Sequence, residues 1–389
     1  MYGVVLALAL FSTISTAFAT IAVALGTLFI IYNYFLTKKF PQFDSEILKV
    51  LAIYFSAQIL IALTSLDILV SLREVLGEFH RFFPLIFAIT FIKNREQLIG
   101  VLIATLISSL INDTVGVYQY FVKEMPRAQG LEYSPTFFAS SMLIQIPILI
   151  FMVKENLTPK MLRPVAVFTI LLSVFCLGLS FTRGAWLAFV VVIFIFAILE
   201  KKYRKATVKV FTALLIAFLL VLSLSPKLQG RIATLTDRNF QSNSERILMW
   251  ESAIQIFEDY HIHGIGQKMF EKMYNEQYIS PYAKERPDEE MSGHTHPHNN
   301  FLFALSEGGL IGLASFIFLY AYFFRRFFLQ YKRESAMKFS AGLTLFIILL
   351  ALHLEGLTYT NLNQVKLMRE FWVIAGSLMT ANRFLGNRI

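Results

Sequence analysis

The sequence predicts an all-α polytopic membrane protein, with about twelve transmembrane helices and one large non-cytoplasmic loop that itself contains helices. Hydrophobic residues make up 56% of the 389-residue chain, charged residues only 16%, and the mean hydropathy is +0.59. This composition is too apolar for a soluble globule. Apolar runs of spanning length recur along the chain, and Lys and Arg gather in short clusters between them. Together these observations predict that most of the chain lies in a lipid bilayer.

Candidate spans are apolar stretches near the ~20 residues that a helix needs to cross the hydrocarbon core. Residues 3–36 form one run that is too long for a single pass, and a polar break between Ser12 and Thr16 divides it into two short helices. The run lacks a basic start and a small-residue cleavage site, so we expect it to be retained. Ten further spans are expected at 47–66, 82–92, 97–117, 135–153, 164–181, 184–199, 208–224, 299–324, 339–358 and 369–384.

The basic clusters predict the orientation, because cytoplasmic loops of membrane proteins carry an excess of Lys and Arg. When both termini are placed in the cytoplasm, every cluster falls on the cytoplasmic side. The clusters are Lys38-Lys39, Lys93 with Arg95, Lys154 with Lys160 and Arg163, Lys201 to Lys205, and Arg325-Arg326 with Lys332-Arg333. This pattern accounts for the net charge of +9 without a nucleic-acid partner, since no basic stretch is interleaved with stacking aromatic residues.

The opposite side keeps a few short segments and one long loop. These are 67–81, 118–134, 359–369, the corner at Arg183 and the loop 225–298. We therefore expect three regions. Residues 1–224 hold the first nine helices, residues 225–298 form the loop that carries the chemistry, and residues 299–389 hold helices ten to twelve.

The long loop is expected to contain a helix of its own. Ser242-Asn243-Ser244-Glu245 matches the S-x-x-E capping box that begins a helix. Apolar residues follow at helical spacing from Ile247 to Phe257, and the pattern ends before Gly264, which is suited to a left-handed helix end. Arg246 is thus expected in the first turn of this helix, one turn before Trp250.

His298 is the candidate catalytic residue, because it stands where the long loop enters the apolar run 299–324. An imidazole titrates near neutral pH, so at the wet edge of the bilayer it is suited to act as a general base toward a hydroxyl. Ala304, Gly308 and Gly312 follow at four-residue steps, a pattern that permits close packing against a neighbouring helix. The alternative is an interfacial histidine without a chemical role.

A metal site is a further alternative for the triplet His294, His296 and His298. Alternate residues of an extended segment face the same side, which would bring the three imidazoles together. However, Pro297 restrains the backbone, and no Cys, Asp or Glu at a tight spacing completes a ligand shell. We therefore expect neither a metal ion nor a cofactor.

Arginines on the non-cytoplasmic side form the second candidate group. Arg183 is the most informative, because it separates two apolar runs and a charge at the centre of a membrane helix costs about 2.5–3.5 kcal/mol. Guanidinium groups make paired, charge-assisted hydrogen bonds with phosphate oxygens, so several that converge would suit a diphosphate. The alternative is extension toward lipid headgroups, above all for Arg73 and Arg81. The candidate diphosphate ligands are Arg183, Arg246, Arg127, Arg73 and Arg81.

Several short motifs jointly resemble the O-antigen ligase and polymerase superfamily. His298-Asn299, followed after nine residues by Gly309-Leu310-Ile311-Gly312, is similar to the H-N-x9-G-x-x-G signature of that family. The long loop, the Arg183 corner and the second outer segment carry further similar elements in the family's order. These are Arg246-x-x-x-Trp250 with His263-x-Gly-Ile-Gly266, Thr182-Arg183-Gly184-Ala185-Trp186, and Arg127-Ala128-Gln129-Gly130.

The resemblance implies a metal-independent, inverting glycosyltransferase of the membrane C-type in the bacterial inner membrane. It implies that His298 activates the acceptor hydroxyl, while Arg183 and Arg246 hold the diphosphate of an undecaprenyl-diphosphate-linked glycan at the periplasmic face. The acceptor is a sugar of the lipid A core in the ligase branch and another lipid-linked glycan in the polymerase branch. Leu313 stands where the ligase pattern has Thr, so both branches stay open.

A membrane transporter is the alternative of a different class. A transporter would place ionisable groups in mid-span and show paired broken helices around a central site. The expected spans hold few such groups, Glu307 and Glu355 among them, and the sequence has no internal repeat. Glycosyl transfer is the preferred interpretation, chiefly because of the family resemblance.

Overall fold

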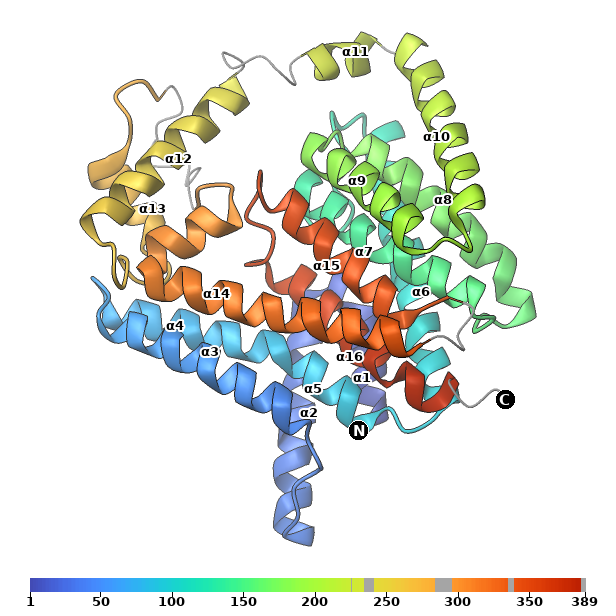
Figure 1. The fold of residues 1–389 in the computed structure, drawn as a ribbon, viewed down its shortest axis with the longest axis horizontal. Helices are drawn as coiled ribbons and strands as arrows, with labels where there is room; N and C mark the ends of the chain where they lie inside the picture. The colour runs from blue at the N-terminus through green and yellow to red at the C-terminus, as the bar shows by residue number, and fades with distance from the viewer. Residues whose placement is uncertain (225, 234–240, 284–295, 335–338, 386–389) are drawn as a thin grey trace.

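The computed structural model describes residues 1–224, 226–233, 241–283, 296–334 and 339–385, and every regular element in them is helical (Figure 1). Seven of these helices are long and apolar enough to cross a membrane. They are α2 Thr16–Thr37, α3 Ser45–Leu63, α6 Arg95–Phe121, α7 Pro135–Lys154, α8 Arg163–Leu179 with the 3-10 turn η2 Lys160–Leu162 before it, α10 Arg204–Leu224, and α14 Asn300–Arg333. The chain is a multi-pass membrane protein, as the sequence predicts.

All twelve predicted spans overlap a helix, but five of these helices are shorter or more polar than the seven. They are α1 Tyr2–Ile14, α5 Phe83–Phe91, α9 Arg183–Leu199, α15 Ala341–Glu355 and α16 Val365–Leu385. A total of twelve membrane crossings therefore stays a prediction. The predicted break in the first apolar run is confirmed at Ser15, which takes an extended backbone between α1 and α2.

The segment 67–81, expected as an outer connection, is instead helical and leads straight into the next predicted span. α4 Ile68–Phe79 begins at Asp67, whose carboxylate accepts the Val70 N–H at 3.1 Å. The 3-10 turn η1 His80–Phe82 then joins α4 to α5. α4 packs against α3 (Figure 1). The sequence hides this helix because Arg73, Glu74 and Glu78 interrupt its apolar pattern, and two more polar residues follow directly in η1.

The described part of the long loop is helical and has a small core of its own. Its elements are α11 Pro226–Ala233, α12 Gln241–Asp259, α13 Phe270–Met273 and the π-helical turn η3 Tyr274–Tyr278. The core residues are Met249, Ala253, Ile256, Ile265, Met269, Phe270, Met273 and Tyr274, with Leu302 of α14 packed against them. α12 begins at Gln241, before the expected capping box, so Arg246 lies in its second turn and not in its first.

α14 is not the straight helix that the sequence suggests, because its backbone reverses at Gly309. Gly309 has φ 57° and ψ −152°, a conformation outside the helical region, and it divides α14 into a short first half and a long second half. The reversal is tight enough that a Cβ added to Gly312 would lie 2.6 Å from the Ala304 carbonyl oxygen. The predicted close packing of small residues is present at Gly308, where an added Cβ would lie 3.1 Å from Ile61 of α3.

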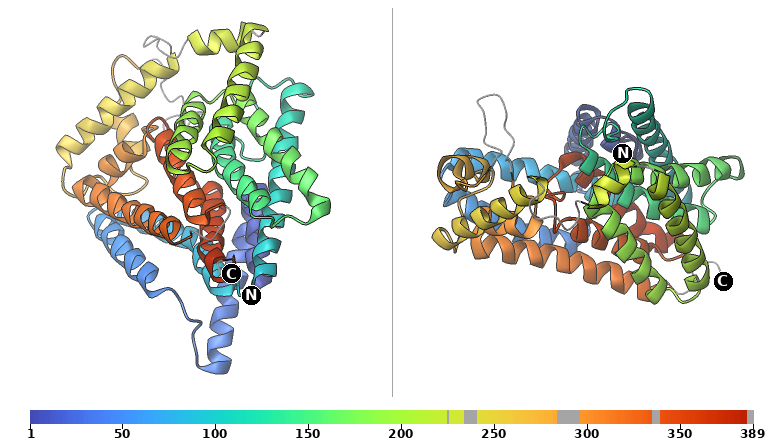
Figure 2. Two further views of the ribbon diagram at one scale, coloured as in Figure 1. Left: turned by 45° about the vertical axis from the view of Figure 1, so that its right-hand side comes forward. Right: turned by 90° about the horizontal axis from the view of Figure 1, so that it is seen from above.

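The segment 261–266 supplies the hydrogen bonds that α14 loses at the reversal. The N–H groups of Leu310 and Ile311 donate to the carbonyls of His261 and Ile262 at 2.9 and 3.1 Å. In the other direction, the N–H groups of Ile265 and Gly266 donate to the carbonyls of Ser306 and Glu307 at 3.3 and 2.9 Å. A broken helix in a membrane protein needs such partners, because lipid offers none. Figure 2 shows α12 and the turn of α14 on one side of the bundle, with α6 and α8 on the other.

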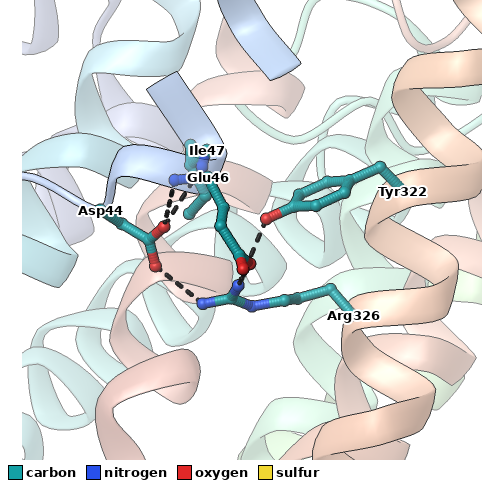
Figure 3. A network of polar contacts seen from close by, with 5 residues as sticks. All are labelled: Asp44, Glu46, Ile47, Tyr322 and Arg326. Atoms are coloured by element: carbon teal, nitrogen blue, oxygen red, sulfur yellow. Dashed lines mark hydrogen bonds and ion pairs between the residues drawn. The ribbon is translucent and has the colours of Figure 1, made fainter. Parts of the chain in front are cut away.

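At its other end, α14 is tied to the start of α3 by ion pairs (Figure 3). The two Nη atoms of Arg326 lie 2.7 Å from Asp44 Oδ2 and 2.5 Å from Glu46 Oε2. Asp44 also caps α3, since its Oδ1 accepts the N–H groups of Glu46 and Ile47. These contacts set how α14 lies along α3, and both helices line the cavity described below.

We expect Gly309→Ala to destabilise the protein by at least about 1–3 kcal/mol, the usual cost of a non-glycine residue in such a backbone region. The added methyl group would also approach the Ile262 carbonyl carbon to 2.5 Å. The measurement is the apparent melting temperature in detergent. Gly178→Ala in α8 is the matched control, because an added Cβ there meets nothing within 4 Å. Equal melting temperatures for the two variants would contradict the reversal.

Candidate active site

His298 is held at the entry to α14 by the residue that follows it. Asn299 is the N-cap of α14, and its Oδ1 accepts the N–H groups of Phe301 and Leu302 at 2.8 and 3.1 Å. Its own N–H and Nδ2 donate to Thr360 Oγ1 and the Leu357 carbonyl, both at 3.1 Å. His298 itself takes a left-handed backbone with φ 51°, so it precedes the helix and does not lie in its first turn.

The imidazole of His298 lies in a cluster of aromatic rings. It stacks on Tyr359 with ring centroids 5.3 Å apart, and it meets the edge of the His296 ring at 4.5 Å. Phe137 of α7 contacts the Tyr359 ring at 5.0 Å. Sequence reasoning missed Tyr359, because a single tyrosine in the short outer segment 359–369 has no pattern that marks it. Its stacking fixes the plane of the His298 imidazole.

Arg183 reaches the same region from the N-terminal end of α9. Its Nη2 donates to Asn243 Oδ1 of α12 at 2.6 Å, which joins the corner between α8 and α9 to the long loop. A Cβ added to the next residue, Gly184, would lie 2.4 Å from Thr358 Oγ1. The Arg183 corner therefore packs directly against the connection between α15 and α16 that carries Tyr359.

Arg127 is directed at the Arg183 corner. Its Nε donates to the Ser180 carbonyl at 2.7 Å, and its Nη2 donates to Thr182 Oγ1 at 3.0 Å. The N–H of Ala128 adds a bond to the Leu179 carbonyl at 3.0 Å. The segment 118–134 thus fixes the turn from which Arg183 extends.

The electrostatics around His296 show that Arg246 belongs to this cluster. Burial lowers the pKa of His296 to about 4, and the charges of Lys268 and Arg246 lower it further. His296 is therefore neutral at pH 7, and its Nδ1 accepts the His298 N–H at 3.3 Å. Burial raises the pKa of Tyr359 to about 12, while the positive charges of Arg246 and Arg127 oppose the rise. Both arginines thus lie within electrostatic range of the stacked rings.

The other two predicted arginines lie elsewhere. Arg81 is buried between α4 and α16, where its guanidinium donates to Glu74 Oε1 at 2.7 Å and Asn363 Oδ1 at 2.6 Å. Arg73 is exposed on α4 and forms no ion pair with the described residues. Asn243, Thr358 and Tyr359 link His298, Arg183, Arg246 and Arg127 indirectly, whereas Arg73 and Arg81 have no such link among the described residues.

A cavity of about 150 Å³ adjoins His296. It is lined by residues of α3, α4, both halves of α14, residues 267–268 and the segment 362–364. Its polar lining includes Glu74, Glu78, Glu307, Gln267 and Lys268, and its aromatic lining includes Tyr54, Phe303, Phe316 and Tyr320. The reversal at Gly309 creates this space, since it places the first half of α14 opposite the second.

Of the histidine triplet, His294 lies outside the described residues. His296 and His298 meet through the edge-to-face ring contact given above. Among the residues that the structure describes, no group of three His, Cys, Asp or Glu side chains is arranged to hold a metal ion.

Residues 168–317 match the family model described as O-antigen ligase. The matched region runs from α8 into the second half of α14, and it contains Arg183, Arg246, His298 and the reversal at Gly309. The match confirms the resemblance seen in the motifs and supports an enzyme of the glycosyltransferase-like ligase and polymerase kind. A search of curated proteins finds no match.

The low pKa of His296 predicts a loss of stability in acid. The ordinary pKa near 6.5 applies in the unfolded chain, so unfolding takes up a proton between about pH 6.5 and pH 4. The contribution of the buried neutral His296 to the free energy of unfolding is present above pH 6.5. We expect up to about 2 kcal/mol of this contribution to be lost on going from pH 7 to pH 5. Apparent melting temperatures across this range should fall less for His296→Gln than for the wild type. His261→Gln, at an exposed position, should follow the wild type, whereas parallel curves for all three proteins would contradict a buried neutral imidazole.

Proposed function

We propose that this O-antigen ligase superfamily member transfers an undecaprenyl-diphosphate-linked glycan to a sugar hydroxyl of the lipid A core. The reaction takes place at the periplasmic face of the bacterial inner membrane, without a metal ion or cofactor. The observation that carries the proposal is a chain of contacts between three distant parts of the sequence: Arg183 bonds to Asn243 on the helix of Arg246, Arg246 acts electrostatically on His296 and Tyr359, and both of these rings contact the His298 ring. A helix bundle has no evident packing reason to gather these polar groups at one place.

The arginines are suited to the leaving group. A diphosphate carries several anionic oxygens, and a guanidinium offers five donors in a planar fork that binds two of them at once. Arg183 and Arg246 approach from α9 and α12, which the Arg183–Asn243 hydrogen bond joins. Arg127 acts on the diphosphate through the corner that it holds, and so it is a positioning residue.

His298 is the general base that takes the proton from the acceptor hydroxyl as this oxygen attacks the anomeric carbon. The bond from that carbon to the diphosphate oxygen breaks on the opposite face, and the configuration is inverted. The diphosphate leaves with the bonding electron pair, and the arginines stabilise its charge. Stacking on Tyr359 and the cap at Asn299 hold the imidazole in one orientation, so little reorganisation is needed during the reaction.

The topology that fits this chemistry is twelve crossings with both termini in the cytoplasm. Residues 1–224 form helices one to nine, residues 225–298 form the periplasmic catalytic loop, and residues 299–389 form helices ten to twelve. The clustered groups stand in connections and at helix ends, as a transferase requires, and not in mid-span as in a transporter. The second candidate acceptor is another lipid-linked glycan, which would make the protein a polymerase, since Leu313 departs from the ligase pattern.

His298→Ala should reduce glycan transfer by about 10²–10⁴-fold, the usual contribution of a general base. The assay is transfer in membrane vesicles supplied with lipid-linked donor and lipid A core. His261→Ala is the matched control, because His261 is exposed and belongs to the same matched region. Near-normal transfer by a folded His298→Ala protein would remove the base assignment, whichever acceptor is used.

Arg183→Lys and Arg246→Lys should each weaken donor binding by about tenfold or more, because lysine keeps the charge but loses the paired hydrogen bonds. The measurement is the KM for the lipid-linked donor, with Arg73→Lys on the exposed face of α4 as the control. An unchanged donor KM in both test variants would exclude a diphosphate site at these arginines.

The choice of acceptor is tested by deleting the gene and analysing the surface glycans. Lipid A core without any glycan would identify a ligase, and lipid A core that carries one repeat unit would identify a polymerase.

A further inference from the structure

The cavity beside His296 is chemically distinct from the arginine cluster. Three acidic side chains, Glu74, Glu78 and Glu307, line it, and among the described residues of the lining Lys268 is the only basic one apart from the neutral His296. This lining therefore offers a phosphate group a single cation. Carboxylates are instead strong hydrogen-bond acceptors for hydroxyl groups.

Part of the acceptor capacity of the lining is left for a ligand. Glu74 and Glu78 each use Oε1 within the described protein, toward Arg81 at 2.7 Å and the Tyr54 hydroxyl at 2.6 Å. A carboxylate has two oxygens, and the second oxygen of each has no hydrogen-bond partner among the described residues. The Tyr320 hydroxyl likewise has no hydrogen-bond partner among them, although the residue is only 6% exposed. Hydroxyl donors and acceptors of a ligand would satisfy these groups.

The size and the aromatic lining of the cavity favour a single ring. The volume is about 150 Å³, and a cavity of this size is known to hold one six-membered ring. Phe303, Phe316 and Tyr320 add aromatic surface to the acidic lining. A lining that combines hydrogen-bond acceptors with aromatic faces matches a pyranose, which has hydroxyls around its edge and C–H groups on its faces.

The position of the cavity separates it from the leaving group. Its lining contains no residue of α9 or α12, the helices that carry Arg183 and Arg246, whereas His296 contributes both to the lining and to the ring contact with His298. In an inverting displacement, the attacking hydroxyl and the diphosphate lie on opposite faces of the anomeric carbon. The cavity adjoins the His296 ring, which contacts the proposed base His298, and this position favours the acceptor as its ligand.

We infer that the cavity between α3, α4 and the two halves of α14 is a subsite for one neutral sugar ring of the acceptor, placed one residue from the sugar whose hydroxyl meets His298. The inference rests on the proposed function for the identity of the acceptor, but the binding of a saccharide here requires no transfer. Glu74, Glu78 and Tyr320 are its specificity-determining residues, and His296 forms the wall between the two subsites.

Binding is tested on the full-length protein in nanodiscs by saturation-transfer NMR. The probes are a core oligosaccharide freed of lipid and phosphate, and inorganic pyrophosphate. Ala304→Leu fills the cavity from the first half of α14, and Ala314→Leu is the matched control, since it makes the same change at an exposed position in the second half. Tyr320→Phe is the second test variant, because it removes only a hydroxyl group that has no partner among the described residues.

We expect Ala304→Leu to raise the Kd of the oligosaccharide by about tenfold or more, through steric exclusion. Tyr320→Phe should raise it several-fold through one lost hydrogen bond. Neither variant should alter pyrophosphate binding, and Arg246→Lys should show the reverse pattern. An unchanged oligosaccharide Kd in both cavity variants would overturn the subsite. So would displacement of the core oligosaccharide by the released donor glycan alone, which would assign the cavity to the donor.

The two proposals fail separately. If the cavity variants lose oligosaccharide binding while His298→Ala transfers glycan normally, the subsite stands and the proposed base does not. If the wild type transfers glycan but the core oligosaccharide binds equally well to all variants, the proposed function stands and the cavity is only a packing feature.

Discussion

The constraint on which the site depends is the backbone reversal at Gly309. A helix that breaks leaves N–H and C=O groups without partners, and in a membrane protein lipid cannot supply them. The segment 261–266 satisfies them through four backbone hydrogen bonds with residues 306–311. Gly264 and Gly266 make this approach possible, because both have positive φ and an added Cβ on Gly264 would lie 2.4 Å from the Glu307 backbone. The glycines at 264 and 266 and those at 308 and 309 are thus more than 40 residues apart in the sequence but pack against each other.

The reversal has two consequences for the surroundings of His298. It places the first half of α14 opposite the second half. Between them lies the cavity that Glu74, Glu307 and Tyr320 line. It also leaves Asn299 and Asn300 facing the connection between α15 and α16. There the Asn300 N–H donates to the Gly356 carbonyl at 2.8 Å, and its Nδ2 donates to Asn361 Oδ1 at 2.8 Å. This connection carries Tyr359 and packs against Gly184, so it joins the histidines to the Arg183 corner.

The charges divide the region into two parts with different chemistry. On the side of α9 and α12 lie arginines, close to the Tyr359 ring and to the His296 ring, which burial keeps neutral at pH 7. On the side of α3 and α4 lie carboxylates, and Arg81 is held by Glu74 and Asn363 rather than by the arginine cluster. A neutral histidine between these two parts accepts a hydrogen bond at Nδ1 from the His298 N–H and keeps Nε2–H as a donor, without adding charge to either side.

The sequence by itself determined the membrane class, most helix positions and the candidates His298, Arg183, Arg246 and Arg127, because hydropathy, basic clusters and short motifs are local signals. It missed α4, whose charged residues mask the apolar pattern, and Tyr359, which has no pattern. The sequence also predicted one uninterrupted span at 299–324, because a glycine pair in an apolar run is equally compatible with close packing and with a break. Tertiary structure decided these points. Which glycine takes a positive φ, and which arginine meets which ring, depends on partners such as Ile262, Asn243 and Thr358 that lie far away in the chain.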